Sequence, residues 1–350
     1  MGSQKGPGVT MRILVTGNLG FVGSVVAPYL AARGHEVQGL DAGYFESCLF
    51  GRPADPPTVR KDVRDVEPED LEGFQAVVHL AALSNDPLGE LDPDLTAAIN
   101  LGGTLRVAEA ARRAGVARMV FASSCSLYGL GGAAAVDESG DMRPQTAYAK
   151  SKIDAEAALD ALGRDDFSPV FLRFATAYGV SPRLRLDLVV NNLVGWAVSE
   201  GVIRIQSDGS PWRPLVHVED MARAIAAALE APREVVHRQA FNVGRSDANY
   251  QVKTIAADIG RLLPHCQVSI NPQASPDTRS YRVSFDRIHA ALPDFRPEWG
   301  LERGILQLRD AYREHGLDQA TFHDRRFTRL LQLKHLLENG QLGSNLRWTH

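Results

Sequence analysis

Short apolar runs alternate with helical stretches along the first half of the chain, and this alternation is the strongest constraint on its fold. Helices are expected at about 21–33 and 94–114, and a third carries Tyr148. The apolar runs lie around them at 11–16, 35–41, 75–82, 118–124 and 170–175. Strands joined by helices form a parallel sheet that is covered on both faces. We therefore predict an α/β fold built on a doubly wound parallel sheet.

The regular alternation ends after Gly179, and this change predicts a second, smaller domain. The predicted organisation is a disordered leader at 1–10, a sheet domain at 11–180 that regains 214–245, a smaller domain at 181–213 and 246–320, and a C-terminal helical extension at 321–350. Ligands bind at the carboxyl edge of an open parallel sheet. The smaller domain is therefore expected to cover that edge and to bind substrate.

Composition and charge argue against several classes of protein. The 350 residues include 44% hydrophobic and 23% charged side chains, and the net charge of −4 favours neither nucleic acid nor a membrane surface as partner. No apolar run reaches the roughly 18 residues that span a bilayer. The cysteines Cys48, Cys125 and Cys266 are widely spaced, which argues against a disulfide framework and a zinc site. We expect a cytoplasmic protein with no metal.

A glycine-rich turn, TGNLGFVG at 16–23, directly follows the first predicted strand. Gly17, Gly20 and Gly23 permit a tight turn and a close approach of the backbone to a pyrophosphate at the start of a helix. The alternative is that these glycines serve the turn alone. Asp41, which ends the second strand, favours a dinucleotide site, because a carboxylate there accepts both ribose hydroxyls of NAD and repels the 2′-phosphate of NADP. We therefore expect NAD as cofactor.

Further motifs follow in order: KDVRD from 61, HLAA from 79, INLGGT from 99, SSCSLYG from 123, YAKSK from 148 and LRFATAYG from 172. With the GxxGxxG spacing of the glycine turn, this series resembles the extended branch of the short-chain dehydrogenase/reductase superfamily. That branch contains the NAD-dependent nucleotide-sugar epimerases and dehydratases, including UDP-glucose 4-epimerase-like enzymes. The resemblance covers roughly residues 11 to 312. It implies a Rossmann-type NAD domain and a C-terminal domain that binds a nucleotide-diphosphate sugar.

The resemblance also implies which residues form the two binding sites. Those at the cofactor are Gly17, Asn18, Leu19, Gly20, Phe21, Val22, Gly23, Asp41, Asp62, Val63, Leu80, Ala81, Ala82 and Asn100, together with Tyr148 and Lys152. Those at the substrate are Ser124, Ser126, Thr176, Asn191, Arg213 and Arg279. Thr176 stands where the family usually has asparagine, so the substrate pose is expected to differ. For Asn191, the alternative is that it caps a helix.

Tyr148 and Lys152 lie four residues apart in an expected helix, so they share one face. Such a pair can be an ordinary solvated helix face, but Ser124 at the end of a neighbouring strand favours catalysis. Tyrosine has a pKa of about 10 and becomes an effective base near neutral pH only where positive charge stabilises its phenolate. We predict that Tyr148 takes the proton from a sugar hydroxyl. Lys152 and the nicotinamide are expected to lower the Tyr148 pKa, and Ser124 to bridge the sugar hydroxyl and the phenol.

The two positions after Ser124 distinguish the reactions of this family. Related dehydratases carry Asp-Glu there, whereas this chain has Cys125 and Ser126, and related 3,5-epimerases place a cysteine where Ser126 stands. We expect Cys125 to be a small buried residue. The prediction is therefore an NAD-dependent nucleotide-sugar 4-epimerase. The alternatives are an NADPH-dependent reductase of a 4-keto nucleotide sugar, a dehydratase, or a non-catalytic NAD-binding regulator.

The expected helix at 94–114 is apolar on more than one face, and a second apolar stripe requires a second partner. The two stripes are Leu101, Leu105 and Ala108, and Ala98, Val107 and Ala111. We predict a homodimer that pairs this helix with the helix at 148–162. The alternative is that the extension at 321–350 covers the second stripe within one chain. The extension is expected to pack on its own chain, and His217 to have a structural role.

Overall fold

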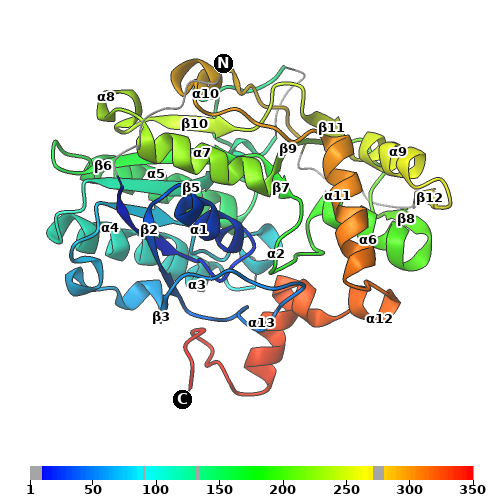
Figure 1. Cartoon of the computed structure of the whole chain (residues 1–350), viewed down its shortest axis with the longest axis horizontal. Helices are drawn as coiled ribbons and strands as arrows, with labels where there is room; N and C mark the ends of the chain where they lie inside the picture. Colours follow the sequence, from blue (N-terminus) through cyan, green and yellow to red (C-terminus); the bar gives the residue numbers. More distant parts are fainter. Residues whose placement is uncertain (1–9, 90, 131–133, 271–279, 350) are drawn as a thin grey trace.

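The computed structural model describes residues 10–89, 91–130, 134–270 and 280–349, so the expected leader lies almost wholly outside the described residues. In the described chain, seven parallel strands form one sheet in the order β10-β6-β5-β4-β1-β2-β3 (Figure 1). They are β1 Arg12–Thr16, β2 Glu36–Asp41, β3 Thr58–Arg60, β4 Ala76–His79, β5 Arg118–Ser124, β6 Ser168–Phe174 and β10 Ala240–Val243. The strand order reverses between β1 and β4. This confirms the doubly wound α/β fold, and the reversal point is where such sheets bind ligands.

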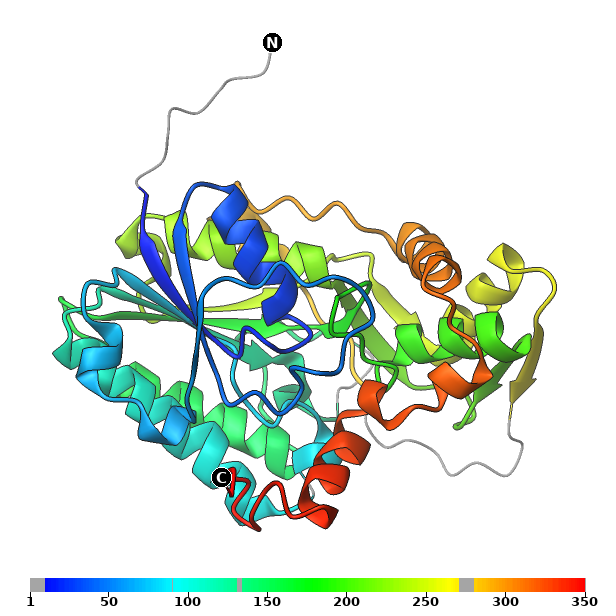
Figure 2. The same cartoon turned by 60° about the horizontal axis from the view of Figure 1, so that its bottom comes forward.

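Helices cover both faces of this sheet. Helices α1 (Gly23–Ala32) and α7 (Val218–Glu230) pack together on one face, and α4 (Thr104–Arg113) and α5 (Ala147–Leu162) pack together on the other (Figure 2). Along β1, Ile13 and Val15 join the first helical layer, whereas Leu14 joins the second. A strand buried on both faces needs apolar side chains on both, which explains the uninterrupted apolar run in the sequence.

The helix expected at 94–114 is three segments rather than one. It begins with α3 (Pro93–Ala97), passes through a π-helical turn, η3 (Ala98–Gly103), and continues as α4. In the π turn, the buried Asn100 side chain accepts from the Leu83 N–H at 2.8 Å and donates to the Ser151 hydroxyl at 3.0 Å. Apolar periodicity cannot reveal such a turn, because it arises from tertiary contacts of a polar side chain.

The smaller domain lies against the carboxyl edge of the sheet (Figure 1). Its larger elements are β7 Thr176–Tyr178, α6 Val189–Glu200, β8 Val202–Ile205, β9 Trp212–His217, β11 Asn249–Gln251, α9 Val252–Leu262, β12 Gln267–Ile270 and α11 Leu301–Glu314. Strands β11, β9 and β7 form one small sheet, and β12 and β8 another. Helices α6, α9 and α11 supply its apolar core. The shorter helices of the chain are η1 Val63–Asp65, η2 Pro68–Leu71, α2 Asp86–Gly89, η4 Cys125–Tyr128, α8 Arg233–Val236 and α10 Asp286–Ala291.

The C-terminal extension leaves the smaller domain and returns to the sheet domain (Figure 2). It contains α12 (Gln319–Phe322), η5 (Arg325–Phe327) and α13 (Arg329–Glu338). Its leucines Leu333, Leu336, Leu342 and Leu346 join the apolar cluster that also contains Val63 and Val107. The extension therefore packs on its own chain, as expected. Within the described chain, no helix is long and apolar enough to cross a membrane.

Candidate active site

A cavity of about 900 Å³ lies at the carboxyl edge of the sheet, between the two domains. On the sheet side it is lined by the turn after β1 and by residues that end or follow β2, β4 and β5. The smaller domain contributes Ile205 and Arg213, and the extension contributes Arg329. One cavity thus receives most residues predicted for cofactor and substrate.

The glycine turn leaves room for a ligand only because its key positions lack side chains. A Cβ on Gly17, where φ is +75°, would lie 2.7 Å from the Ala81 nitrogen, and a Cβ on Gly23 would lie 2.2 Å from the Gly17 oxygen. The turn therefore packs tightly against the segment after β4 and directs the start of α1 toward the cavity. A cradle of this kind fits the pyrophosphate of a dinucleotide at a helix N-terminus.

Asp41 holds this turn from the end of β2. Its carboxylate accepts from the Leu19 N–H at 3.0 Å and from the Gly43 N–H at 2.7 Å. Burial raises the pKa of Asp41, and these two hydrogen bonds oppose the rise. Asp41 lines the cavity, so its carboxylate can meet a ribose there.

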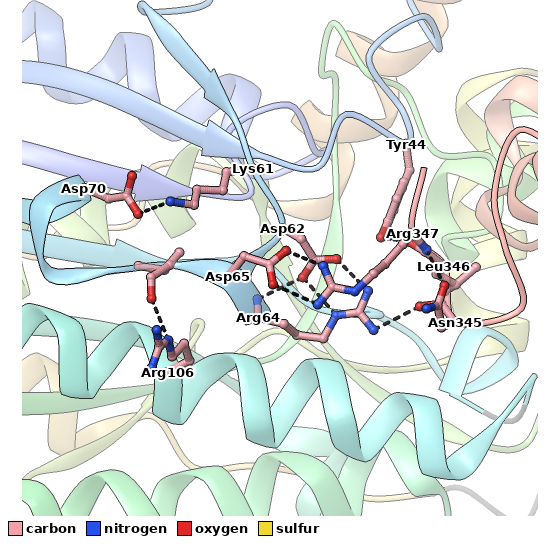
Figure 3. A network of polar contacts seen from close by, with 11 residues as sticks. Tyr44, Lys61, Asp62, Arg64, Asp65, Asp70, Arg106, Asn345, Leu346 and Arg347 are labelled. Atoms are coloured by element: carbon pink, nitrogen blue, oxygen red, sulfur yellow. Dashed lines mark hydrogen bonds and ion pairs between the residues drawn. The ribbon is translucent and has the colours of Figure 1, made fainter. Parts of the chain in front are cut away.

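Other predicted cofactor residues divide into those at the cavity and those that support it. Phe21, Val22, Asp62, Val63, Leu80, Ala81 and Ala82 line it, whereas Asn18, Leu19 and Asn100 do not. The buried Asn18 side chain instead donates to the Thr58 hydroxyl at 2.8 Å, and Asn100 serves the π turn. Figure 3 shows Asp62, which begins η1 and forms an ion pair with Arg64 at 2.6 Å.

Ser124, Tyr148 and Lys152 come together at this cavity. Thr146 begins α5, with its hydroxyl accepting from the Ala149 N–H at 3.1 Å, and this fixes the first turn that carries Tyr148. The Ser124 hydroxyl lies near enough to the Tyr148 hydroxyl to lower its pKa, and it also accepts from the Ser126 N–H at 3.1 Å. Lys152 is 4% exposed and donates to the Ala122 carbonyl at 2.7 Å, so the pair is not a solvated helix face.

The ionisation of these side chains differs from our prediction. Burial raises the pKa of Tyr148 to about 12, although its hydrogen bond to Ser124 acts in the opposite direction. Burial also lowers the pKa of Lys152 to about 8, and the charge of Glu156 opposes this. Lys152 therefore stays mainly protonated at neutral pH. Lys152 is not among the groups that shift the Tyr148 pKa, and desolvation of the phenolate outweighs the opposing charge of Arg185. The expected lowering by Lys152 and the nicotinamide together stays a prediction.

The predicted substrate residues are not all at the cavity. Ser126, Thr176 and Arg213 line it, and the buried Ser126 hydroxyl oxygen has no hydrogen-bond partner among the described residues. A buried polar atom without a partner is a natural contact for a ligand. Arg279 lies outside the described residues.

The position of Asn191 shows that both interpretations of this residue, as a substrate contact and as a helix cap, are wrong. Its side chain is fully buried, accepts from the Gly179 N–H at 2.9 Å and donates to the Gly179 carbonyl at 3.1 Å. It neither lines the cavity nor caps α6, which begins after Leu188. Its neighbour Asn192 lines the cavity instead. Sequence pattern alone could not decide which of two adjacent asparagines faces inward.

Two further residues are structural, as expected. Cys125 is buried, and its thiol donates to the Arg173 carbonyl at 3.1 Å rather than lining the cavity. His217 is 1% exposed and stacks on Trp299 with ring centroids 4.1 Å apart. Burial lowers the pKa of His217 to about 4, so it is neutral near pH 7.

Sequence reasoning missed Arg185, Asp187 and Arg329, which also line the cavity. Arg185 pairs with Asp187 at 2.9 Å and donates to the Ser84 hydroxyl at 3.2 Å. The signal in the sequence is the pair of arginines and the aspartate that alternate with leucines in RLRLD at 183–187. Arg329 had no comparable signal, since it lies in a helix far along the chain from every motif.

Comparison with known proteins identifies relatives of the whole arrangement. Residues 13–244 match the model of the NAD dependent epimerase/dehydratase family. The chain is 30% identical over 316 residues to the UDP-glucose 4-epimerase of Mycolicibacterium smegmatis, with 87% of this chain and 99% of that protein covered. It is 32% identical over 298 residues to that of Corynebacterium glutamicum, with 81% and 90% covered. The structure of Thermus thermophilus UDP-glucose 4-epimerase with NAD has a TM-score of 0.71 at 28% identity, covering 87% of this chain and 99% of that chain.

Proposed function

We propose, from the premise that this chain belongs to the NAD-dependent epimerase/dehydratase family and uses NAD, that it inverts carbon 4 of a nucleotide-diphosphate sugar. The observation that carries the proposal is that Ser124, Tyr148 and the buried Lys152 line the same cavity as the glycine cradle. Because the M. smegmatis relative is named a UDP-glucose 4-epimerase, UDP-glucose is the first substrate to test.

The side chains support a simple cycle of proton transfers. NAD held in this cavity would supply both the acceptor and the donor of the carbon 4 hydride. Ser124 and Tyr148 hold the carbon 4 hydroxyl between them, and Tyr148 Oη receives its proton as the carbonyl forms. With NAD bound, the positive charge of the nicotinamide and the ammonium of Lys152 would stabilise the phenolate, together with the hydroxyl of Ser124. After the keto-sugar presents its other face, Tyr148 gives the proton back to the oxygen.

Residues after Ser124 argue against loss of water. Dehydration needs an acid to protonate the leaving hydroxyl and a base to remove the proton beside the ketone. At the positions where related dehydratases carry Asp-Glu, Cys125 is buried away from the cavity, and burial raises its thiol pKa well above the ordinary value. Ser126 reaches the cavity but cannot supply a carboxylic acid. Epimerisation needs no group beyond those present.

Arg213 and Ser126 are the proposed contacts for the nucleotide-diphosphate part of the substrate. Both line the cavity, Arg213 from β9 of the smaller domain. A terminal guanidinium nitrogen of Arg213 donates to the Trp212 carbonyl at 3.0 Å, which restrains the end of a long, flexible side chain. A guanidinium there fits a diphosphate, because it offers several donors in one plane.

We retain a homodimer through α4 and α5 as part of the proposal. Leu101 and Leu105 stay half-buried in the single chain, whereas Val107 and Ala111 are buried within it, in a cluster that includes leucines of the extension. The available surface is therefore smaller than the sequence predicted. The proposed compartment is the cytoplasm, which suits the buried unpaired thiols of Cys48 and Cys125.

The proposal is tested by incubating the purified chain with UDP-glucose and no added nucleotide, and separating the products by ion-exchange chromatography. The expected product is the carbon 4 epimer, with NAD released when the protein is denatured. A product lighter by one water would indicate a dehydratase. Turnover that depends on added NADPH would indicate a reductase.

A further inference from the structure

Three arginines are buried beside the cofactor cavity, and two of them have carboxylate partners. Arg183 donates twice to Asp55, at 2.7 and 2.8 Å, and Arg185 donates twice to Asp187, at 2.9 and 3.1 Å. The third, Arg329, is 2% exposed and has no ion pair to a carboxylate within the described part of the chain. The carboxylates of Asp41 and Asp187 act on Arg329 only without direct contact. A buried cation is stabilised by a directly paired anion, so Arg329 is the arginine of this group that can pair with an anionic ligand.

The guanidinium of Arg329 lines the cavity and is held from behind. It donates to the Arg183 carbonyl at 3.0 Å and to the Arg326 carbonyl at 3.5 Å, and it lies 4.4 Å from the ring centroid of Phe45. A guanidinium has five N–H donors. These contacts fix its position and leave donors for a ligand in the cavity.

Arg329 lies beside Phe45, which follows β2, and beside Arg183, whose side chain donates to the Ser24 hydroxyl in the first turn of α1 at 2.9 Å, so it lies near the glycine turn. Its charge also acts on groups at both ends of the cavity. At one end, burial raises the pKa of Asp41, and the charges of Arg183 and Arg329 oppose the rise. At the other, Arg185 and Arg329 keep the pKa of Asp187 low despite its burial, and the charge of Arg185 also reaches Tyr148. Asp41 is assigned to the adenosine half of NAD and Tyr148 works at the nicotinamide half. The part of a dinucleotide that joins these halves is the pyrophosphate.

The tail after α13 fastens the extension to the adenosine end of the cavity (Figure 3). The bonds join the Tyr44 hydroxyl to the Leu346 carbonyl, Arg64 to the Asn345 carbonyl at 2.9 Å, and Arg347 to Asp65 at 2.9 Å. The Trp348 indole also donates to the Ala42 carbonyl at 2.6 Å. These partners flank Asp41 and Asp62. Before Arg329 in the chain, the Phe327 carbonyl accepts from the Leu186 N–H at 2.8 Å, so the extension is attached on both sides of Arg329.

We propose that residues 183–187 and 329–348 form the outer wall of the NAD site, and that Arg329 binds the pyrophosphate of the dinucleotide. The inference rests on the proposed NAD-dependent function and adds a binding residue beyond the family-matched residues 13–244. An arginine pairs with phosphate oxygens through two parallel N–H donors, which suits a fixed guanidinium on a cavity wall. The phosphates supply the direct ion pair that Arg329 does not form with any carboxylate among the described residues.

The test compares the affinities of two probes, ADP-ribose and adenosine, for protein freed of retained nucleotide. Arg329→Gln should weaken the affinity for ADP-ribose about 10- to 100-fold, which is the range expected for the loss of one charge-assisted hydrogen bond. The affinity for adenosine should change less than about threefold. Lys334→Gln is the matched control, because it removes a positive charge from an exposed position on the same helix. The Lys334→Gln variant should bind both probes with unchanged affinity. The amount of NAD released on denaturation should fall in Arg329→Gln alone.

Equal weakening of both probes would show a purely structural role for Arg329, and unchanged ADP-ribose affinity would remove it from the site; either result overturns the proposal. Arg329→Lys keeps the charge and is used if the glutamine variant does not fold. The lysine variant should bind ADP-ribose about 3- to 10-fold more weakly and adenosine almost unchanged, because a lysine lacks the paired donors of an arginine. Both measurements omit sugar substrate. A chain that fails to epimerise UDP-glucose but shows this probe selectivity would reject the reaction and keep the inference.

Discussion

The two walls of the NAD site are built in different ways. The inner wall consists of the glycine turn at 17–23, Asp41 and the catalytic residues at 124, 148 and 152, which all lie on or beside the sheet edge. The outer wall depends on contacts between distant segments: Arg329 meets Arg183 across 146 residues, and Arg183 meets Asp55 across 128. The inner wall needs particular backbone shapes, which short motifs reveal. The outer wall depends on charged side chains from distant segments, and only the complete fold determines where these side chains come together.

If only the inner wall performs the chemistry, removal of the Tyr148 hydroxyl should cause the largest loss of turnover. Tyr148→Phe should lower turnover by about 10²- to 10⁴-fold, because it removes the group that transfers the proton. NAD released on denaturation should stay near one equivalent, as in the unmodified protein. Arg329→Gln should show the opposite pattern, with reduced NAD content and turnover restored by excess NAD. A Tyr148→Phe variant within a few-fold of normal turnover would reject Tyr148 as the base.

The backbone requirement of the inner wall can be tested at Gly23. Gly23→Ala would place a Cβ 2.2 Å from the Gly17 oxygen, so the turn must move away from its NAD-binding shape. We expect at least a tenfold loss of NAD affinity, measured by titration calorimetry, since one misplaced phosphate contact is worth about this much. Gly300→Ala is the control, because its Cβ would lie 3.9 Å from its nearest neighbour, Arg245. Equal affinities in the two variants would contradict the cradle.

A buried cation on the inner wall should make stability depend on pH. The pKa of Lys152 falls from 10.5 to about 8 on folding, so the unfolded chain binds more protons between these values. Raising the pH from 7 to 9.5 therefore favours the folded state of the unmodified protein. Lys152→Met should lose this contribution, and its unfolding free energy relative to the unmodified protein should drop by about 2 kcal/mol over that range.

Urea unfolding of nucleotide-free protein at the two pH values measures this difference. Lys150→Met is the control, because Lys150 lies on the same helix with its side chain 67% exposed. It should show no such trend. A stability difference for Lys152→Met that does not change with pH would mean that Lys152 titrates near its ordinary value.

The sequence predicted the sheet well where strands are buried on both faces. Five apolar runs correspond to β1, β2, β4, β5 and β6, whereas β3 and β10 were missed. Strand β3 has three residues, with Val59 and Arg60 exposed, and β10 has only four residues. Short strands at the edges of a sheet carry little apolar periodicity, so tertiary pairing determines them.

Prediction of the active site from the sequence was also limited to features that short motifs carry. Gly17, Asp41, Tyr148 and Lys152 could be placed at the cavity from motif order, but the raised pKa of Tyr148 could not. Desolvation depends on everything packed around a side chain, and no local spacing encodes it. Asn192 and Arg329 were missed for a related reason, because facing direction and long-range approach belong to the folded chain.

The central claim is that this chain epimerises a nucleotide sugar by removing and returning the same hydride at carbon 4. The most direct measurement uses UDP-glucose labelled with deuterium at carbon 4, incubated with the purified chain without added nucleotide and followed by NMR. We expect the carbon 4 epimer with deuterium still at carbon 4. Loss of the label to solvent, or recovery of unchanged UDP-glucose after prolonged incubation, would contradict it.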